Sequence, residues 1–593
     1  MDQPRQKFLK PGFAITLLLF SILPAHADYE ADIGYTALES ELGTGIPDGN
    51  GVPVSQSEAS IRVGNDTAWI LDPGNAEFSG KTVTDISGAV PGVYSGHATS
   101  VGKKFFGGLT STSPGITNIA AYLALDWISN GFLQANEGGG QASQPLYSSS
   151  RISNHSWIGN GTTTAANTDI LTRLDWVIER DDTVQTVGFT GSASNPLLSS
   201  GYNVISVNTT HRPTDAGSAA GGGIYTSGRT KPEIVAPEIN TSSATPRVAS
   251  ASALLIDAAH DNPAWSTDPL SIFTTNRNGD TIYNAERAEV IKAALMTGAD
   301  RATSNSTSAD ITDYRADVAD QTVNGLDRRF GAGQLNIYNS YHAIAAGEQN
   351  SIEDQAGNAG LIGTTGFDYD PAFGGMQGSN ATATYYFPPT SAPARLSAAL
   401  VWNLAVNGGS ANNFIGSATL YDLDLQLFDV TDPGNWVLVG SSTSTNENTE
   451  NLWLLLEGGK DYALRVIPGT GQAVFQWDYA LAWQVTPVPQ PLSIEMTYVP
   501  EVGVKNQFYW WGGLSASGGV PPYTYSLVGG WLPWPLTLNV ETGVITGMAW
   551  NVVTAYFTIQ VTDANSDTAT LQSQITVNQS ANVCGSCHGA TSF

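Results

Sequence analysis

The segment from Gly228 to Leu255 constrains the fold of this chain more than any other part. An apolar run, Ile234 to Ala236, ends at Pro237, and a loop then leads through Thr241-Ser242-Ser243-Ala244-Thr245-Pro246 into a stretch of Ala, Ser, Val and Leu. A helix so poor in charge must be buried. Ser242 would lie in its first turn, beside free backbone N–H groups and the positive end of the helix dipole, where a developing negative charge is stabilised. Serine is also a common N-cap residue, so the segment alone leaves both a nucleophile and a cap open.

The same segment closely resembles the serine block of subtilases, the subtilisin-like serine peptidases. Their usual pattern is Lys-Pro-Asp-Ile-Val-Ala-Pro followed by Gly-Thr-Ser-Met-Ala-Thr-Pro, and the chain reads Lys231-Pro-Glu-Ile-Val-Ala-Pro237 and then Asn240-Thr-Ser-Ser-Ala-Thr-Pro246. The resemblance implies that Ser242 is the nucleophile. Asn240 stands where the family usually has glycine, and Arg247 stands where it usually has histidine.

A nucleophilic serine needs a base, and His97 is the best of the seven histidines. It lies in Ser95-Gly-His-Ala-Thr-Ser-Val-Gly102, which resembles the subtilase histidine block His-Gly-Thr-His-Val-Ala-Gly. His155, in Ser153-Asn-His-Ser-Trp157, resembles the strand that lines the substrate cleft, and we interpret it as a cleft or core residue. We interpret three further histidines as structural: His211, His260 and His342.

The third member of such a triad is a carboxylate that orients the histidine. The stretch Gly49 to Ser60 resembles the subtilase pattern Gly-Val-x-Val-Ala-Val-Ile-Asp-Thr-Gly and puts Glu58 where the family has aspartate. The competitor is Asp72, which follows the apolar run Trp69-Ile-Leu71. We favour Glu58, because Asp72 leaves a shorter stretch for a strand, a loop and the start of a helix before His97.

The oxyanion site is less complete. An amphipathic helix over 169–179 precedes the strand that begins at Thr183, and subtilases end this strand with an asparagine whose amide binds the oxyanion. That asparagine is absent here, which leaves Thr190, Ser192 and Asn195 as candidate donors. Loss of one such donor costs about 10²–10³ in turnover. We therefore keep two functions open: a serine endopeptidase, or a catalytically decayed subtilase that acts as an extracellular binding or surface protein through its β modules.

The blocks predict an α/β fold: a subtilisin-like parallel sheet with helices on both faces, followed by two all-β sandwich domains. The peptidase-like domain is expected over residues 28–349, because Arg329 to Asn336 resembles the closing subtilase segment. Period-two alternation predicts a β-sandwich over 355–487, and strands separated by Gly and Pro turns predict an Ig-like domain over 490–577. Asp422 and Asp424 are either calcium contacts or solvent-facing strand carboxylates.

The N-terminus predicts export. Two lysines precede the apolar run Phe13 to Leu23, and Ala25-His-Ala27 offers a signal-peptidase site, so residues 1–27 read as a signal peptide. That run is too short to span a membrane, and no later stretch reaches about 18 apolar residues, so we expect a secreted or periplasmic protein without a transmembrane segment. The net charge of −28 excludes a basic nucleic-acid-binding face and leaves proteins or peptides as substrates.

The peptidase prediction does not explain two features of the C-terminal part. Four tryptophans are either a sugar-binding platform, for contact with a polysaccharide or surface, or core residues: Trp510, Trp511, Trp531 and Trp534. The tail, residues 578–593, holds Cys584-Gly-Ser-Cys587-His588, a pattern of covalent haem attachment with His588 as ligand. We expect no haem there, because the motif lies close to the chain end and lacks apolar walls to bury a macrocycle.

Overall fold

The computed structural model describes residues 29–135, 142–189, 194–211, 217–355, 357, 359–488, 490–497, 502–564 and 566–579. The chain divides into two compact units on either side of the Thr486–Pro487 bond. The predicted signal peptide and the Cys584-to-His588 motif lie outside the described residues. No helix among the described residues combines the length and the apolar character needed to cross a membrane.

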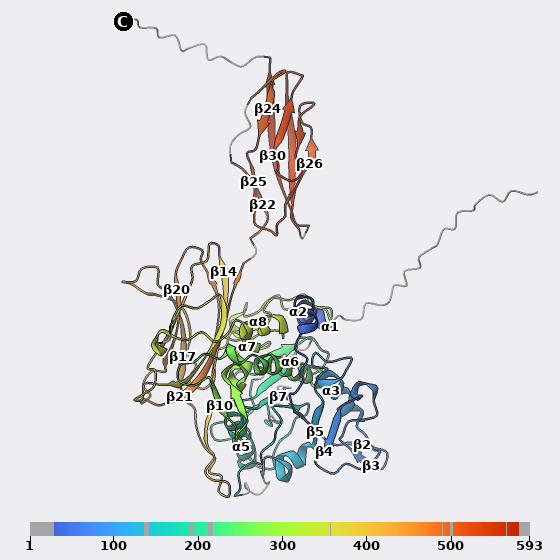
Figure 1. Cartoon of the computed structure of the whole chain (residues 1–593), viewed down its shortest axis with the longest axis vertical. Helices are drawn as coiled ribbons and strands as arrows, with labels where there is room; N and C mark the ends of the chain where they lie inside the picture. Colours follow the sequence, from blue (N-terminus) through green and yellow to red (C-terminus); the bar gives the residue numbers. More distant parts are fainter. Residues whose placement is uncertain are drawn as a thin grey trace, which may run out of the picture. The chain divides into compact units, whose positions relative to one another are not determined.

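The first unit is built on a seven-stranded sheet in which every neighbouring pair is parallel (Figure 1). Parallel neighbours require crossover connections, which is why helices alternate with strands in this half of the chain. From one edge to the other, the strands are β4 (Thr82–Asp85), β5 (Asn118–Leu123), β1 (Val54–Glu58), β6 (Ile152–His155), β7 (Val184–Gly188), β8 (Ile205–Thr209) and β9 (Ile234–Ala236).

The helix α6 (Thr241–Asp261) packs against four strands of this sheet, β6 to β9. Its residues from Ala244 to Ala259 are all buried, as the lack of charge predicted. Helix α3 (Gly96–Phe106) packs against α6. The other helices of the unit are α1 (Tyr29–Asp32), α2 (Tyr35–Leu42), α4 (Ala124–Asp126), α5 (Thr164–Asp181), α7 (Ala288–Gly298) and α8 (Ile337–Ala345).

Two antiparallel four-stranded sheets follow within the same unit and enclose a shared apolar core, which makes them a β-sandwich. One sheet contains β12 (Thr365–Phe373), β21 (Trp477–Pro487), β14 (Ala394–Val401) and β19 (Thr449–Leu456), and the other contains β13 (Ala383–Phe387), β20 (Tyr462–Pro468), β17 (Leu423–Asp429) and β18 (Val437–Ser442). The outer face of the first sheet contributes Phe367, Tyr369, Ala399 and Ala482 to the core of the α/β part. The sandwich thus covers the α/β part without a solvent layer between them.

The short hairpins of the first unit pair β2 (Ile61–Val63) with β3 (Asp66–Ala68), β10 (Phe273–Thr275) with β11 (Thr281–Tyr283), and β15 (Ala405–Asn407) with β16 (Ser417–Thr419). The second unit is all β, with its own core. Its strands are β22 (Ser493–Met496), β23 (Gly503–Val504), β24 (Phe508–Trp511), β25 (Leu514–Ser517), β26 (Thr524–Gly530), β27 (Thr537–Leu538), β28 (Ile545–Met548), β29 (Val553–Thr562) and β30 (Thr568–Asn578). The predicted order, a parallel sheet with helices followed by antiparallel sandwich sheets, is confirmed.

Buried carboxyl groups where the sandwich joins the α/β part predict a pH-dependent stability. Burial raises the pKa of Glu348 and of Asp370 to about 7. Both groups stay protonated in the folded state at a pH at which the unfolded chain has already lost the proton, so their contribution falls as the pH rises through 7. Between pH 6 and pH 8 each group should cost about 1 kcal/mol, and Tm should drop by several degrees. Thermal unfolding at the two pH values measures this drop. Glu348→Gln should reduce it, and a higher Tm at pH 8 would contradict the expectation.

Candidate active site

Glu58 ends the central strand β1, and its side chain is 2% exposed. Its Oε2 atom lies 2.8 Å from Nδ1 of His97, and its Oε1 accepts a hydrogen bond from Gln56 Nε2 at 2.9 Å. Burial raises the pKa of Glu58, and the hydrogen bond from His97 acts in the opposite direction. A buried carboxylate needs such partners to stay charged. Glu58 is therefore held against the imidazole.

His97 is the second residue of α3, and its position follows from the helix start. The Ser95 side chain caps the helix by accepting a hydrogen bond from the N–H of Ala98 at 3.1 Å. The Nδ1 edge of the imidazole faces Glu58, and the side chain is 39% exposed. The hydrogen bond with Glu58 raises the pKa of His97 above its usual value of 6.5. With Nδ1 engaged by the carboxylate, Nε2 is the nitrogen left for a substrate or nucleophile.

Ser242 is the second residue of α6, so the proposed nucleophile lies in the first turn of this helix. Asn240 is the N-cap, and its side chain accepts a hydrogen bond from the N–H of Ser243 at 2.9 Å. Its φ of −153° is extended backbone, which explains why asparagine can replace the family glycine without strain. Within the described residues, the N–H groups of Thr241 and Ser242 have no acceptor. They are the free first-turn amides that the sequence pattern predicted.

His97 and Ser242 line one cleft of about 420 Å³, together with Ser156, Trp157, Ile158, Gly188, Asn240 and Thr241. The Ser242 hydroxyl donates to the main-chain oxygen of Ser156 at 3.4 Å, and the Ser156 hydroxyl donates to the main-chain oxygen of Ser242 at 3.2 Å. No hydrogen bond joins the described side chains of His97 and Ser242. The structure thus pairs Glu58 with His97 and places His97 and Ser242 in one cleft, without a direct hydrogen bond between these two. Catalytic contacts are often loose before a substrate binds.

Of the three candidate oxyanion donors, only one belongs to the described residues. Thr190 and Ser192 lie outside the described residues. Asn195 is described, and it does not line the cleft. The free N–H groups of Thr241 and Ser242 are two donors that the described part of the cleft offers.

The alternative acid, Asp72, does not touch His97. Its backbone N–H donates to Oγ1 of Thr99 at 2.9 Å, and its side chain accepts from the N–H of Gly74, which closes a local turn. It lies beside the outer side of α3, next to Tyr94 and Lys103. The contact with the imidazole is made by Glu58.

Three of the other described histidines have partners away from the cleft. His155 is fully buried, its Nε2 lies 2.8 Å from Oε1 of Gln185, and burial lowers its pKa to about 4. It is a core residue of β6. His260 pairs with Glu286 at 3.0 Å and His342 with Glu41 at 3.2 Å. Neither reaches the cleft.

The contacts of two residues near the site were not predicted from the sequence. Ser156 borders the nucleophile, and the signal for it was its place in the cleft-like Asn154-His-Ser156 pattern. Arg247, which replaces a family histidine, binds Glu238 at 3.0 Å and lies over the ring of Tyr29 at 3.7 Å. It ties the N-terminal helix α1 to α6, and nothing local in the sequence indicated that contact.

The predictions about the tryptophans, a metal site and haem have different outcomes. Trp511 is a fully buried core residue of the second unit, whereas Trp510, Trp531 and Trp534 are about half exposed or more. Asp424 is 8% exposed and therefore not a solvent-facing carboxylate. Among the described residues, no group of three or more His, Cys, Asp or Glu side chains could hold a metal ion. Cys584, Cys587 and His588 lie outside that part of the chain.

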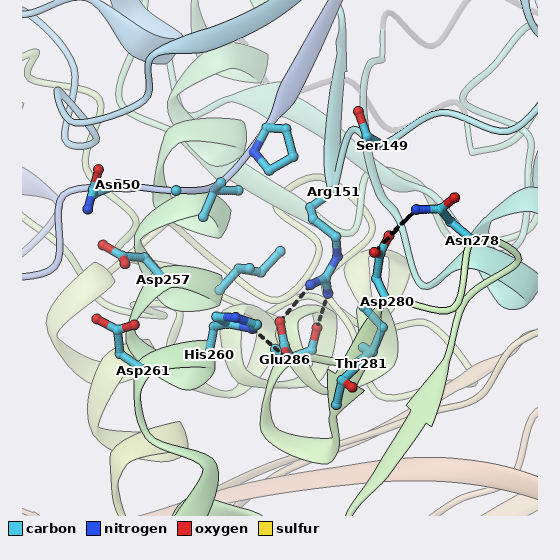
Figure 2. Close-up of a pocket in the computed structure, with 15 residues that line it drawn as sticks. Asn50, Ser149, Arg151, Asp257, His260, Asp261, Asn278, Asp280, Thr281 and Glu286 are labelled. Atoms are coloured by element: carbon cyan, nitrogen blue, oxygen red, sulfur yellow. Dashed lines mark hydrogen bonds and ion pairs between the residues drawn. The ribbon is translucent and has the colours of Figure 1, made fainter.

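A larger cavity, of about 530 Å³, lies at the other end of α6 (Figure 2). Figure 2 shows Arg151 and His260 both directed at the carboxylate of Glu286, which they bind at 2.6 Å and 3.0 Å. Asp257, also in its wall, accepts hydrogen bonds from the backbone N–H groups of Asp48 and Gly49. The two basic side chains of this cavity thus bind one carboxylate, and no described hydrogen bond joins His260 to the hydroxyl of Ser149 or Thr281 in its lining. The cleft of His97 and Ser242 is therefore the candidate active site.

In comparisons with known proteins, a family model matches only within the second unit. Residues 491–578 match the family model described as "Putative Ig domain". A search of curated proteins finds no match.

Three solved structures illustrate the structural similarities. The serine protease MycP1, described as an essential component of the type VII (ESX-1) secretion system, is 12% identical, with 54% of this chain and 90% of MycP1 aligned and a TM-score of 0.29. Human CDH23 EC21-23 is 15% identical over 26% of this chain and 57% of its own, with a TM-score of 0.17. A Bacteroides fragilis protein described as a "putative alpha-galactosidase" is 20% identical over 15% of this chain, with a TM-score of 0.13, and the alignment spans only 18% of its length. The chain thus has a weak structural match to a serine protease over about half its length and carries an Ig-like domain at residues 491–578.

Proposed function

We propose that the chain is a serine endopeptidase of the subtilase type that hydrolyses peptide bonds of proteins or peptides. The observation that carries this proposal is the convergence of Glu58, His97 and Ser242, with Glu58 Oε2 at 2.8 Å from His97 Nδ1 and with His97 and Ser242 in one cleft. The order of acid, base and nucleophile along the chain, and the sequence blocks around His97 and Ser242, support the same proposal.

In the proposed mechanism, Ser242 Oγ attacks the carbonyl carbon of the substrate while His97 Nε2 accepts its proton. Nδ1–H stays on the Glu58 side, and the carboxylate stabilises the imidazolium that forms. His97 then donates the proton to the leaving amine, and a water molecule activated by the same nitrogen hydrolyses the acyl-enzyme. The N–H groups of Thr241 and Ser242, at the positive end of α6, are the described donors for the oxyanion.

The direct test is covalent labelling by a fluorophosphonate probe together with cleavage of an unfolded protein such as reduced casein. The proposal expects both for the purified chain. Absence of both would refute it.

A second function is favoured by one observation, the hydrogen bond of the Ser242 hydroxyl with the Ser156 main chain instead of with His97. In this alternative the α/β part is a decayed subtilase, and the chain binds an extracellular partner through its β modules. A chain that folds normally but takes up no fluorophosphonate would favour this alternative.

The His97 environment predicts how activity depends on pH. His97 must be neutral to accept the proton, and its hydrogen bond with Glu58 raises its pKa above 6.5. We therefore expect kcat/KM to rise with pH, with a midpoint above 6.5, in initial-rate measurements on a peptide substrate. A midpoint below 6.5 would contradict the role of Glu58.

We also propose that the protein acts outside the cytoplasm. The support is the pattern of two lysines, an apolar run and Ala25-His-Ala27 at the N-terminus. N-terminal sequencing of the exported protein should start at Asp28.

A further inference from the structure

The central strand β1 is polar where a parallel sheet normally carries apolar side chains. All five of its residues are buried, yet Val54 is the only apolar one among Val-Ser-Gln-Ser-Glu. Buried parallel strands are usually rich in Val, Ile and Leu. A polar residue at such a place requires a partner, and the partners of Gln56 point to a specific task.

Gln56 is 1% exposed and links the strand of the acid to the helix of the base. Its Nε2 donates one proton to Glu58 Oε1 at 2.9 Å and the other to the main-chain oxygen of Ala98 at 2.8 Å. Both partners are acceptors, so only the amino side of the amide fits between them. Ala98 directly follows His97, which means that one side chain ties Glu58 to the first turn of α3.

The Gln56 side chain is accommodated at a cost in folding stability. A Cβ on Gly102 of α3 would lie 3.1 Å from Oε1 of Gln56 and equally close to two phenylalanine rings, so the glycine leaves space for the amide and for these rings. The Oε1 atom itself is buried without a hydrogen-bond partner in the described structure. A buried acceptor left unpaired is unfavourable, and so is glycine inside a helix. An apolar residue at position 56 would avoid the first cost.

We propose that Gln56 is a positioning residue that holds the Glu58 carboxylate in register with Nδ1 of His97. This inference rests on the proposed function. A glutamate has one more rotatable bond than an aspartate, so it needs a second contact to fix its carboxylate. Gln56 supplies that contact on Oε1 and leaves Oε2 for the imidazole.

The test compares Gln56→Leu, which removes both donors at similar size, with Ser57→Ala. Ser57 is the next residue of the strand, is fully buried, and has a hydroxyl without a described partner, so it is a matched control. We expect Gln56→Leu to lower kcat by about 10–100-fold, as loss of supporting hydrogen bonds does at metal sites, with KM unchanged. Ser57→Ala should keep both constants.

A second readout separates positioning from simple loss of structure. The imidazole of His97 is titrated by NMR in chains that also carry Ser242→Ala. Without Gln56 the Glu58 carboxylate loses a donor that favours its charged form, so the pKa of His97 should fall. An unchanged titration in Gln56→Leu would overturn the inference, even if kcat fell. A shifted titration in a protein whose wild type has no peptidase activity would support the role of Gln56 and refute the proposed function instead.

Discussion

Replacing Ser242 by alanine should abolish fluorophosphonate labelling and lower kcat by roughly 10⁶-fold, as loss of the triad serine does in subtilisin. The physical reason is that the Ser242 hydroxyl, in the first turn of α6, is the proposed nucleophile in the cleft that it shares with His97. The change removes one oxygen, which makes a single hydrogen bond of 3.4 Å to the main chain, so the fold should be unaffected. Labelling is measured on the intact protein by mass, and turnover on an unfolded protein substrate.

The adjacent Ser243 offers a matched control. It lies in the same first turn of α6, with its backbone N–H bonded to Asn240 and its side chain outside the cleft lining. Ser243→Ala should keep labelling and turnover. Equal labelling of the wild type and the Ser242→Ala variant would show that the probe reacts elsewhere and would exclude Ser242 as the nucleophile.

Two residues of the site, Ser242 and His97, could be chosen from sequence because each lies at the start of a strongly patterned helix. Ser242 follows an apolar strand and opens a helix with few charged residues, and His97 lies in the first turn of a helix that begins with small residues. The parallel sheet follows from the alternation of strands and helices. These are local signals, and the structure has the elements where the patterns predicted them.

The supporting contacts could not be predicted, because they join residues that are distant in the chain. The amide of Gln56 meets the carbonyl of Ala98, and the hydroxyl of Ser242 meets the carbonyl of Ser156, across different elements. The outer face of a sandwich sheet also completes the core of the α/β part, although alternation alone suggested a separate module. Periodicity tells which side of a strand is buried, but not which element covers it.

The second large effect is expected for Glu58→Gln, which should lower kcat by about 10⁴-fold, as the asparagine variant of a triad aspartate does. Glutamine keeps the size of the side chain but replaces a charged acceptor by a neutral amide. It then stabilises neither the Nδ1–H tautomer nor the imidazolium. Because the Glu58 hydrogen bond raises the pKa of His97, the midpoint of the pH–rate profile should also fall in this variant.

Asp72→Asn is the control for this experiment, since Asp72 carries a carboxylate near the same helix but contacts Thr99 and Gly74. Its kcat and pH midpoint should match the wild type. Glu58→Asp separates charge from reach. The shorter stem withdraws the carboxylate by about one carbon–carbon bond, about 1.5 Å, from a contact of 2.8 Å, so a partial loss between the wild type and Glu58→Gln is expected. If Asp72→Asn lost activity as Glu58→Gln should, while Glu58→Gln kept it, the acid of the triad would be Asp72.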